Sequence, residues 1–181
     1  MKIALYFLFL ASATVFSQAK YITKSGQVNF EASVPSFEEV AAKNNSVTAI
    51  LDSNTGEFAA LAFINAFKFK NALMEEHFNE NYAESRMYPK AIFKGQIDDF
   101  QFDNLSGSET KRAITGTLTF HGVTKAIKTI EVTLILKDGI LSMSGKMSVY
   151  PKDYNIKIPK IVANKIANKV TVEFYFELVQ Q

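Results

Sequence analysis

The chain contains two histidines, and one of them, His121, has neighbours that raise the question of chemistry. An imidazole can donate or accept a proton near neutral pH and can bind a metal ion. In LTFHGVTKAI, residues 118–127, His121 precedes a glycine and lies between two apolar runs. The local sequence offers no acidic residue to orient the ring and no recognisable serine or cysteine nucleophile. This pattern favours a structural role for His121 over a catalytic one.

The second histidine follows two glutamates in MEEHF, residues 74–78. This is not the H-E-x-x-H spacing that places two imidazoles on one helix face around a zinc ion. A solvated helix face explains His77 better than a metal site, so no metal is predicted. An enzyme that uses His121 or His77 nevertheless stays as the alternative to a binding protein.

The residues after His121 predict a tight turn. Gly122 and Val123 have the Gly-X pattern of a two-residue type II′ hairpin turn, in which glycine takes the positive φ. His121 and Thr124 would then face each other across the hairpin neck and fix its register through side-chain hydrogen bonds. We therefore interpret His121, Gly122 and Thr124 as a structural hairpin.

The elements on both sides of this hairpin alternate between apolar and polar residues, which is typical of half-buried strands. Turn residues such as NTG and KDG separate the strands and favour antiparallel hairpins. Bare sheet edges invite aggregation, so we expect the sheet to close into an eight-stranded antiparallel, lipocalin-like barrel, an all-β fold with short flanking helices. The expected strands cover residues 27–34, 46–52, 57–70, 90–103, 111–120, 125–139, 140–150 and 169–179.

Two segments interrupt the strands with helical patterns. Ser36 and Glu39 have the spacing of a capping box, which predicts a short helix over 35–44. Met74, Phe78 and Tyr82 recur at every fourth position and fall on one side of a second helix, which we expect to form a lid on the barrel.

The N-terminal segment reads as an export signal rather than as part of the fold. Residues 1–19 begin with a lysine, continue with a short apolar run and end in small residues, with cleavage expected after Ser17 or Ala19. The remaining residues, 20–181, fit a single domain and contain no long apolar span, so no integral membrane segment is predicted. The chain has no cysteine and a net charge of +2 without a basic stripe, so neither disulfides nor a nucleic-acid partner is expected.

The inward faces of the later strands define an almost uncharged slot. Either these side chains simply fill the barrel, or they line a space for a long apolar ligand. The residues predicted to line it are Leu118, Phe120, Val132, Leu134, Leu136, Met143, Met147, Val149, Phe174 and Phe176.

LTFHGVTKAI, together with the earlier HFNENYAESRMYPKAIFKG and the later YPKDYNIKI, resembles the YceI-like family of exported, lipocalin-like proteins. The resemblance covers residues 21–180 and is most specific at Thr119, at 121–124 and at 88–91. It implies a barrel that holds a polyisoprenoid, a quinone-like lipid or another long amphiphile, and it implies no catalytic residues. The chain departs from many members at KNALMEEHF, where they carry an Arg-Asp-x-His-Leu run.

These observations predict a periplasmic or secreted protein that binds a small amphiphilic lipid for transport, storage or protection. No other cofactor is expected. A stress-related interaction module with a filled barrel is a further alternative. The oligomeric state is left open by the sequence, and a dimer is compatible with it.

Overall fold

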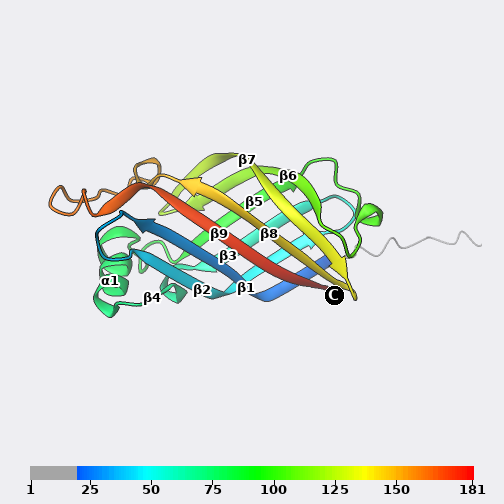
Figure 1. The fold of residues 1–181 in the computed structure, drawn as a ribbon, viewed down its shortest axis with the longest axis horizontal. Coiled ribbons are helices and arrows are strands. Elements are labelled where there is room, and N and C mark those ends of the chain that lie inside the picture. The colour runs from blue at the N-terminus through cyan, green and yellow to red at the C-terminus, as the bar shows by residue number, and fades with distance from the viewer. Residues whose placement is uncertain (1–19) are drawn as a thin grey trace, which may run out of the picture.

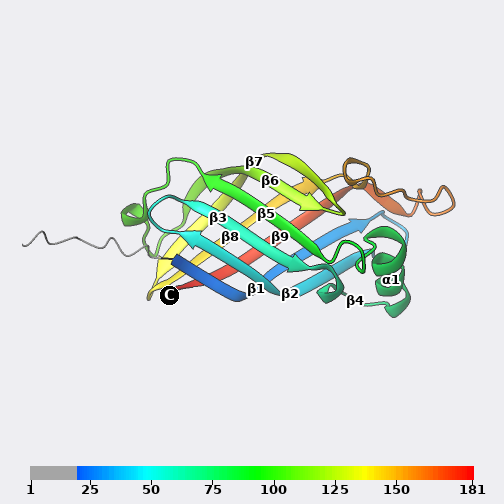
Figure 2. The same cartoon turned by 180° about the vertical axis from the view of Figure 1, so that it is seen from behind.

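The alternating segments form strands that close on themselves in the computed structural model, which describes residues 20–181 (Figures 1 and 2). The predicted signal peptide, with Ser17 and Ala19, lies outside the described residues. The strands are β1 (Lys20–Ser33), β2 (Ala41–Asp52), β3 (Glu57–Phe63), β4 (Lys68–Phe69), β5 (Lys90–Ile97), β6 (Thr110–Phe120), β7 (Val123–Lys137), β8 (Ile140–Val149) and β9 (Ile166–Gln180).

Antiparallel pairing runs through the order β1-β9-β8-β7-β6-β5-β3-β2, and β1 pairs with β2 to close the ring. The closing ladder is long, from Lys20 opposite Asp52 to Glu31 opposite Ala41. The predicted eight-stranded barrel is confirmed. The two-residue strand β4 adds a ninth strand beside β2.

Short helical segments lie between the strands. They are η1 (Ile64–Ala66), α1 (Ala72–His77), the π-helical turn η2 (Phe78–Tyr82), η3 (Phe102–Asn104) and η4 (Pro151–Tyr154). Asn71 caps α1, because its side-chain oxygen accepts from the backbone N–H of Leu73 at 2.9 Å. Helix α1 and the segment 155–165 lie at one end of the barrel, and the C-terminus lies at the other (Figure 1).

The barrel interior at the C-terminal end is packed shut. Tyr21, which pairs with Gln180, contacts Phe102 of η3 with ring centroids 5.0 Å apart. Other side chains of this region are completely buried, namely Leu51, Val132, Leu134, Leu141 and Leu178. The hydrophobic effect of this filled half stabilises a fold that has no disulfide.

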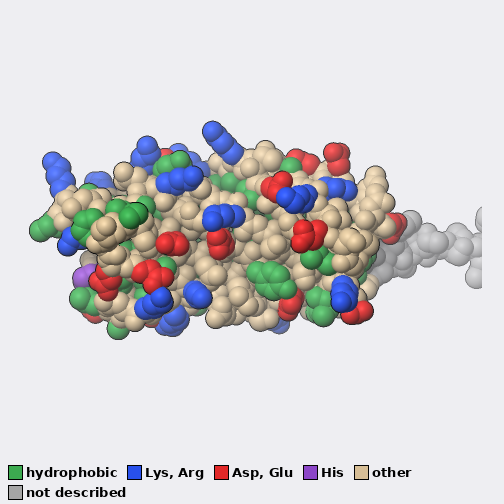
Figure 3. Space-filling view, in the orientation of Figure 1, with side chains coloured by type: hydrophobic (Ala, Val, Ile, Leu, Met, Phe, Trp, Pro, Cys, Tyr) green, Lys and Arg blue, Asp and Glu red, His purple; other side chains and the backbone are tan. Residues whose placement is uncertain are grey.

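Many of the outward positions of the strands are polar or charged. Figure 3 shows Lys and Arg side chains interspersed with Asp and Glu over one face of the barrel. One cross-strand pair joins β8 to β9, where Lys146 Nζ lies 2.7 Å from Glu173 Oε1. Exposed pairs of this kind contribute little to stability, so the apolar interior dominates the energetics.

The predicted helix over 35–44 does not form. Ser36 has a φ of 74°, outside the helical region, and β2 begins at Ala41. Glu39 forms an ion pair with Lys70 instead of closing a capping box. The pairing continues beyond Glu31 and Ala41, because the backbone N–H of Ala32 donates to the carbonyl oxygen of Val40 at 2.8 Å, so the connection is a turn.

Two predicted strands are shorter than expected. The segment 57–70 bends at η1, where the backbone N–H of Ile64 donates to the carbonyl oxygen of Pro89 at 2.9 Å. The strand predicted over 90–103 ends at Ile97, because Asp99 takes a left-handed φ of 49°. Local alternation does not reveal the break at η1, since apolar residues continue beyond it. At 98–99 two adjacent aspartates do interrupt the alternation, which is typical of a bulge, but the strand ends there instead.

Candidate ligand-binding site

A cavity of about 380 Å³ occupies the half of the barrel that carries α1, η2 and η4. Its interior is lined by aliphatic and aromatic side chains from the barrel strands. The lining residues with a charged or titratable side chain are Glu38, His77 and Lys165, all exposed, and the tyrosines Tyr82 and Tyr154. The cavity therefore combines an apolar interior with a charged rim, which suits an amphiphile with a long hydrocarbon portion.

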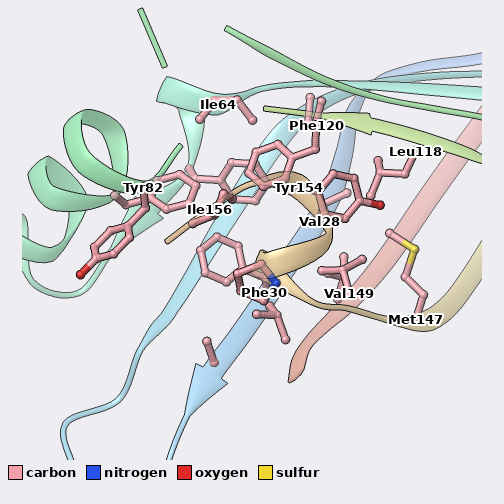
Figure 4. Close-up of a pocket in the computed structure, with 18 of the residues that line it drawn as sticks. Val28, Phe30, Ile64, Tyr82, Leu118, Phe120, Met147, Val149, Tyr154 and Ile156 are labelled. Carbon is pink, nitrogen blue, oxygen red and sulfur yellow. The ribbon is translucent and has the colours of Figure 1, made fainter. Parts of the chain in front are cut away.

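Most of the residues predicted for the slot lie around this cavity (Figure 4). They are Leu118, Phe120, Met143, Met147, Val149, Phe174 and Phe176. All three lid residues, Met74, Phe78 and Tyr82, line it as well. Their contact with a ligand stays a prediction.

Three of the slot residues lie elsewhere. Val132 and Leu134 are fully buried in the filled half, and Leu136 packs against the same core. None of the three lines the cavity. They share the inward face with the lining residues, but they stand farther along the barrel, where no space remains.

Four phenylalanines attach the lid to the barrel. The ring of Phe78 in η2 lies 5.3 Å from Phe30 of β1, 5.2 Å from Phe69 of β4 and 6.1 Å from Phe67. Aromatic pairs at these separations add to the stability from buried area. Sequence reasoning missed Phe30, Phe67 and Phe69 as lining residues. Only the bend at η1 turns Phe67 toward the cavity.

Glu75 ties α1 to β4. Its carboxylate accepts from Lys68 Nζ at 2.6 Å and from the backbone N–H of Phe69 at 3.2 Å. The hydrogen bond from Lys68, together with the one from Phe69, holds the pKa of Glu75 below its usual value. The lid is therefore fixed to the barrel by polar contacts outside and by aromatic packing inside.

Two segments cover the cavity. The first is the lid formed by α1 and η2, and the second is η4 with the residues that follow it. Pro151 begins η4, and Asn155 ends it with a left-handed φ of 59°. Tyr154 is only 2% exposed, and its ring lies 5.7 Å from that of Phe120. Figure 4 shows Tyr154 and Ile156 among the cavity side chains. Neither residue was predicted, because this turn has no strand or helix periodicity.

His121 connects the two covers. Its Nδ1 lies 2.9 Å from the carbonyl oxygen of Tyr154, and its Nε2 lies 2.7 Å from Glu84 Oε2, just after the lid. Carbonyl and carboxylate oxygens only accept hydrogen bonds, so the imidazole is the donor toward these partners. The ring also packs on Tyr88, with centroids 4.5 Å apart. The acidic partner missing from the local sequence is thus supplied by a residue 37 positions away.

The hairpin at His121 differs from the predicted one. Phe120 pairs with Val123, so the two turn residues are His121 and Gly122, with φ values of 48° and 72°. Positive φ at both positions is typical of a type I′ turn, whose twist matches that of the strands. Thr124 does not face His121. It pairs with Thr119, and their hydroxyl oxygens are 2.8 Å apart.

The chain matches the model of the YceI-like domain over residues 13–178. It belongs to the YceI-like family. A search of curated proteins finds no match.

Several solved structures share this YceI-like barrel. A polyisoprenoid-binding domain from Saccharophagus degradans, implicated in plant cell wall breakdown, has a TM-score of 0.78 at 16% identity, covering 91% of this chain and all of that one. BcnA of Burkholderia cenocepacia has a TM-score of 0.69 at 15% identity, covering 85% and 96%. The Campylobacter jejuni YceI protein has a TM-score of 0.59 at 14% identity, covering 99% of both chains. At these identities the likeness is one of fold.

His77 lies at the rim of the YceI-like cavity, exposed on α1. Within residues 20–181 no group of three or more His, Asp or Glu side chains is arranged to hold a metal ion. The helices of this same part of the chain are all too short or too polar to cross a membrane. Both ring nitrogens of His121 are occupied by their contacts with Tyr154 and Glu84. The alternative that the protein is an enzyme therefore depends on His77.

Proposed function

We propose that this YceI-like protein holds a long amphiphile, of the isoprenoid class, inside the open half of its barrel. The observation that carries the proposal is the cavity itself, which has an apolar interior and a charged rim. Each methylene buried there contributes about 0.8 kcal/mol. A chain of about ten carbons then gains about 8 kcal/mol. This gain lies within the cost of association, which is on the order of 4–15 kcal/mol, and each further buried methylene adds to the affinity. The polyisoprenoid-binding domain of similar fold supports the choice of ligand class.

We further infer that the protein is exported and acts in the periplasm or outside the cell. The signal-like pattern of residues 1–19 supports export. Water separates an exported binding protein from the membranes, and long isoprenoids dissolve poorly in water. Enclosure in the barrel suits transport, storage or protection of such a ligand.

A binding role is favoured over catalysis by the position of His121. The imidazole holds Tyr154 and Glu84 together and does not line the cavity. The filled-barrel alternative applies to one half of the molecule only, since the other half contains the cavity.

The test is a lipid analysis of the gently purified protein with a matched pair of variants. Met147 lines the cavity, whereas its neighbour Ser148 is exposed on the other side of β8. Met147→Lys places an ammonium in the cavity, where it cannot be desolvated cheaply beside a hydrocarbon chain. We expect mass spectrometry of organic extracts to find isoprenoid lipid with the wild-type protein and with Ser148→Lys, and not with folded Met147→Lys.

A wild-type protein that carries no lipid and takes up none when refolded with isoprenoids would refute the proposal. Equal lipid content in the two variants would place the ligand elsewhere. Turnover of an isoprenoid that is lost in His77→Ala would favour the enzyme alternative.

A further inference from the structure

Among the described residues that line the cavity, one has a buried polar side-chain atom with no hydrogen-bond partner. The hydroxyl oxygen of Tyr154 is buried and forms no hydrogen bond. Native proteins satisfy nearly all such groups, because a buried hydroxyl that loses its bonds to water pays a desolvation penalty. In the part of the chain that the structure describes, two other buried side-chain atoms lack partners, Asn29 Oδ1 and Asn79 Oδ1, but neither residue lines the apolar cavity. Tyr154 is therefore the place to look for a specific polar contact with a ligand.

The direction of the Tyr154 ring is set by its surroundings. Its backbone carbonyl is held by His121, and its ring packs against Phe120. Figure 4 shows the hydroxyl pointing into the barrel, on the side of Leu118. The hydroxyl of Tyr82, the other tyrosine of the lining, points away toward the outside. The two hydroxyls thus face different environments.

The hydroxyl of Tyr154 is available as a donor. Burial raises the pKa of Tyr154 to about 12, with a smaller contribution from Asp153, so the group keeps its proton at neutral pH. Around the interior of the cavity the side chains are aliphatic or aromatic, and the carboxylate of Glu38 lies at the exposed rim. The acceptor for this proton must come from a molecule that enters the cavity.

We propose that Tyr154 donates a hydrogen bond to an oxygen atom of the bound amphiphile, and that the protein thereby selects oxygenated isoprenoids over plain hydrocarbons. This inference rests on the proposed function. The ligand class is one with a neutral acceptor, such as a ketone, quinone, ether or ester oxygen. That oxygen lies inside the barrel beside Tyr154, and hydrocarbon fills the remaining lining.

This arrangement differs from recognition at the rim. A charged head group would stay in water near Glu38, His77 and Lys165, with its tail inside. With such a ligand, the Tyr154 hydroxyl would contact only the hydrocarbon tail and would have no acceptor for its hydrogen bond. A neutral oxygen inside the cavity satisfies the hydroxyl and introduces no charge that would have to be desolvated.

The experiment compares two probes and three proteins. The probes are farnesylacetone, an isoprenoid ketone, and the hydrocarbon in which a methylene replaces its carbonyl. The proteins are the wild type, Tyr154→Phe, which removes only the hydroxyl, and Tyr82→Phe, which removes the outward hydroxyl of the same lining. Melting temperatures establish that each variant is folded, and dissociation constants are measured for both probes.

We expect Tyr154→Phe to bind the ketone about three- to tenfold more weakly, as the loss of one hydrogen bond implies, and to bind the hydrocarbon as well as or better than the wild type. Tyr82→Phe should leave the ratio of the two affinities unchanged. Infrared spectra provide a second measurement. The carbonyl stretch of the bound ketone should lie at lower frequency in the wild type than in Tyr154→Phe.

The outcomes separate this inference from the proposed function. Equal changes in affinity for the two probes, with an unshifted carbonyl stretch, would overturn the role of Tyr154 and leave the lipid-binding function in place. Such a result would mean that water satisfies the hydroxyl. A wild-type protein that binds neither probe nor any longer isoprenoid would overturn both.

Discussion

Adding bulk at two neighbouring positions of β9 distinguishes an open cavity from a packed core. Phe174 and Phe176 point to the same side of the strand and stack with centroids 5.6 Å apart. Phe176 is only 2% exposed and its ring lies 5.5 Å from that of Phe58. Phe174 is half-buried and faces the cavity. Phe174→Trp should therefore place its extra ring in the cavity, whereas Phe176, which borders the cavity but belongs to the buried core, leaves less space for a larger ring.

The expected magnitudes follow from these surroundings. Overpacking at Phe176 should lower the free energy of unfolding by about 1–3 kcal/mol. Phe174→Trp should cost less than about 1 kcal/mol, because the cavity accepts the ring. If the indole displaces two methylenes of the ligand, the longest ligand loses about 1.6 kcal/mol, or roughly 15-fold in affinity. Shorter ligands, which do not reach the indole, should bind as before.

The assay combines denaturant unfolding with binding of isoprenoid ketones of increasing chain length. The chain has no tryptophan, so each variant contains a single indole and its emission reports one known position. We expect a ligand to change the emission of Phe174→Trp more than that of Phe176→Trp. Tyr175→Trp, on the exposed face of the same strand, is the control for the substitution itself.

Two results would refute the reasoning. If Phe174→Trp is destabilised as much as Phe176→Trp and the chain-length profile is unchanged, the region around Phe174 is packed in solution. If all three variants show the same profile as the wild type, the ligand does not occupy this half of the barrel.

Three further predictions concern the frame around the cavity. His121→Ala should lower the free energy of unfolding by about 1–3 kcal/mol, because it leaves the carbonyl of Tyr154 without its partner, and the folded variant should still bind ligand. A fully stable variant that has lost binding would contradict this. Gly122→Val should destabilise more than His121→Ala, since Gly122 has a φ of 72° and an added Cβ would lie 2.6 Å from Tyr88 Cε1. An equal or higher melting temperature for the valine variant would show that this turn is wrongly described. Because the pKa of Tyr154 is raised from 10.0 to about 12, the folded state holds its proton more tightly than the unfolded state. The contribution of Tyr154 to stability should therefore be constant below pH 10 and fall by about 2 kcal/mol as the pH rises from 10 to 12. This component should be missing in Tyr154→Phe, and identical pH profiles for the two proteins would disprove it.

The barrel could be predicted from the sequence because each strand shows its own alternation of apolar and polar residues. The alternation also placed the correct side chains on the inward face, since one residue of alternation decides between inside and outside. It could not tell how far along the barrel each residue lies. Leu118 and Val132 face inward alike, yet Leu118 lines the cavity and Val132 is enclosed in the core. Depth depends on the register between strands, which the alternation within a single strand does not encode.

The parts of the site that sequence reasoning missed lie where chain segments distant in sequence meet. His121 lacks an acidic neighbour in the sequence, but Glu84 and the carbonyl of Tyr154 reach it from 37 and 33 residues away. A search for local motifs therefore finds the imidazole but misses its two hydrogen-bond partners. Tyr154 belongs to a turn without periodicity, and its significance comes from a missing hydrogen bond, which no pattern of residue types can reveal. In this barrel the strands supply the apolar lining, and the buried polar atom of the cavity that has no partner comes from η4 instead. The selectivity proposed for the oxygen of a ligand therefore depends on a turn that covers the barrel, whereas affinity for its hydrocarbon portion depends on the strands.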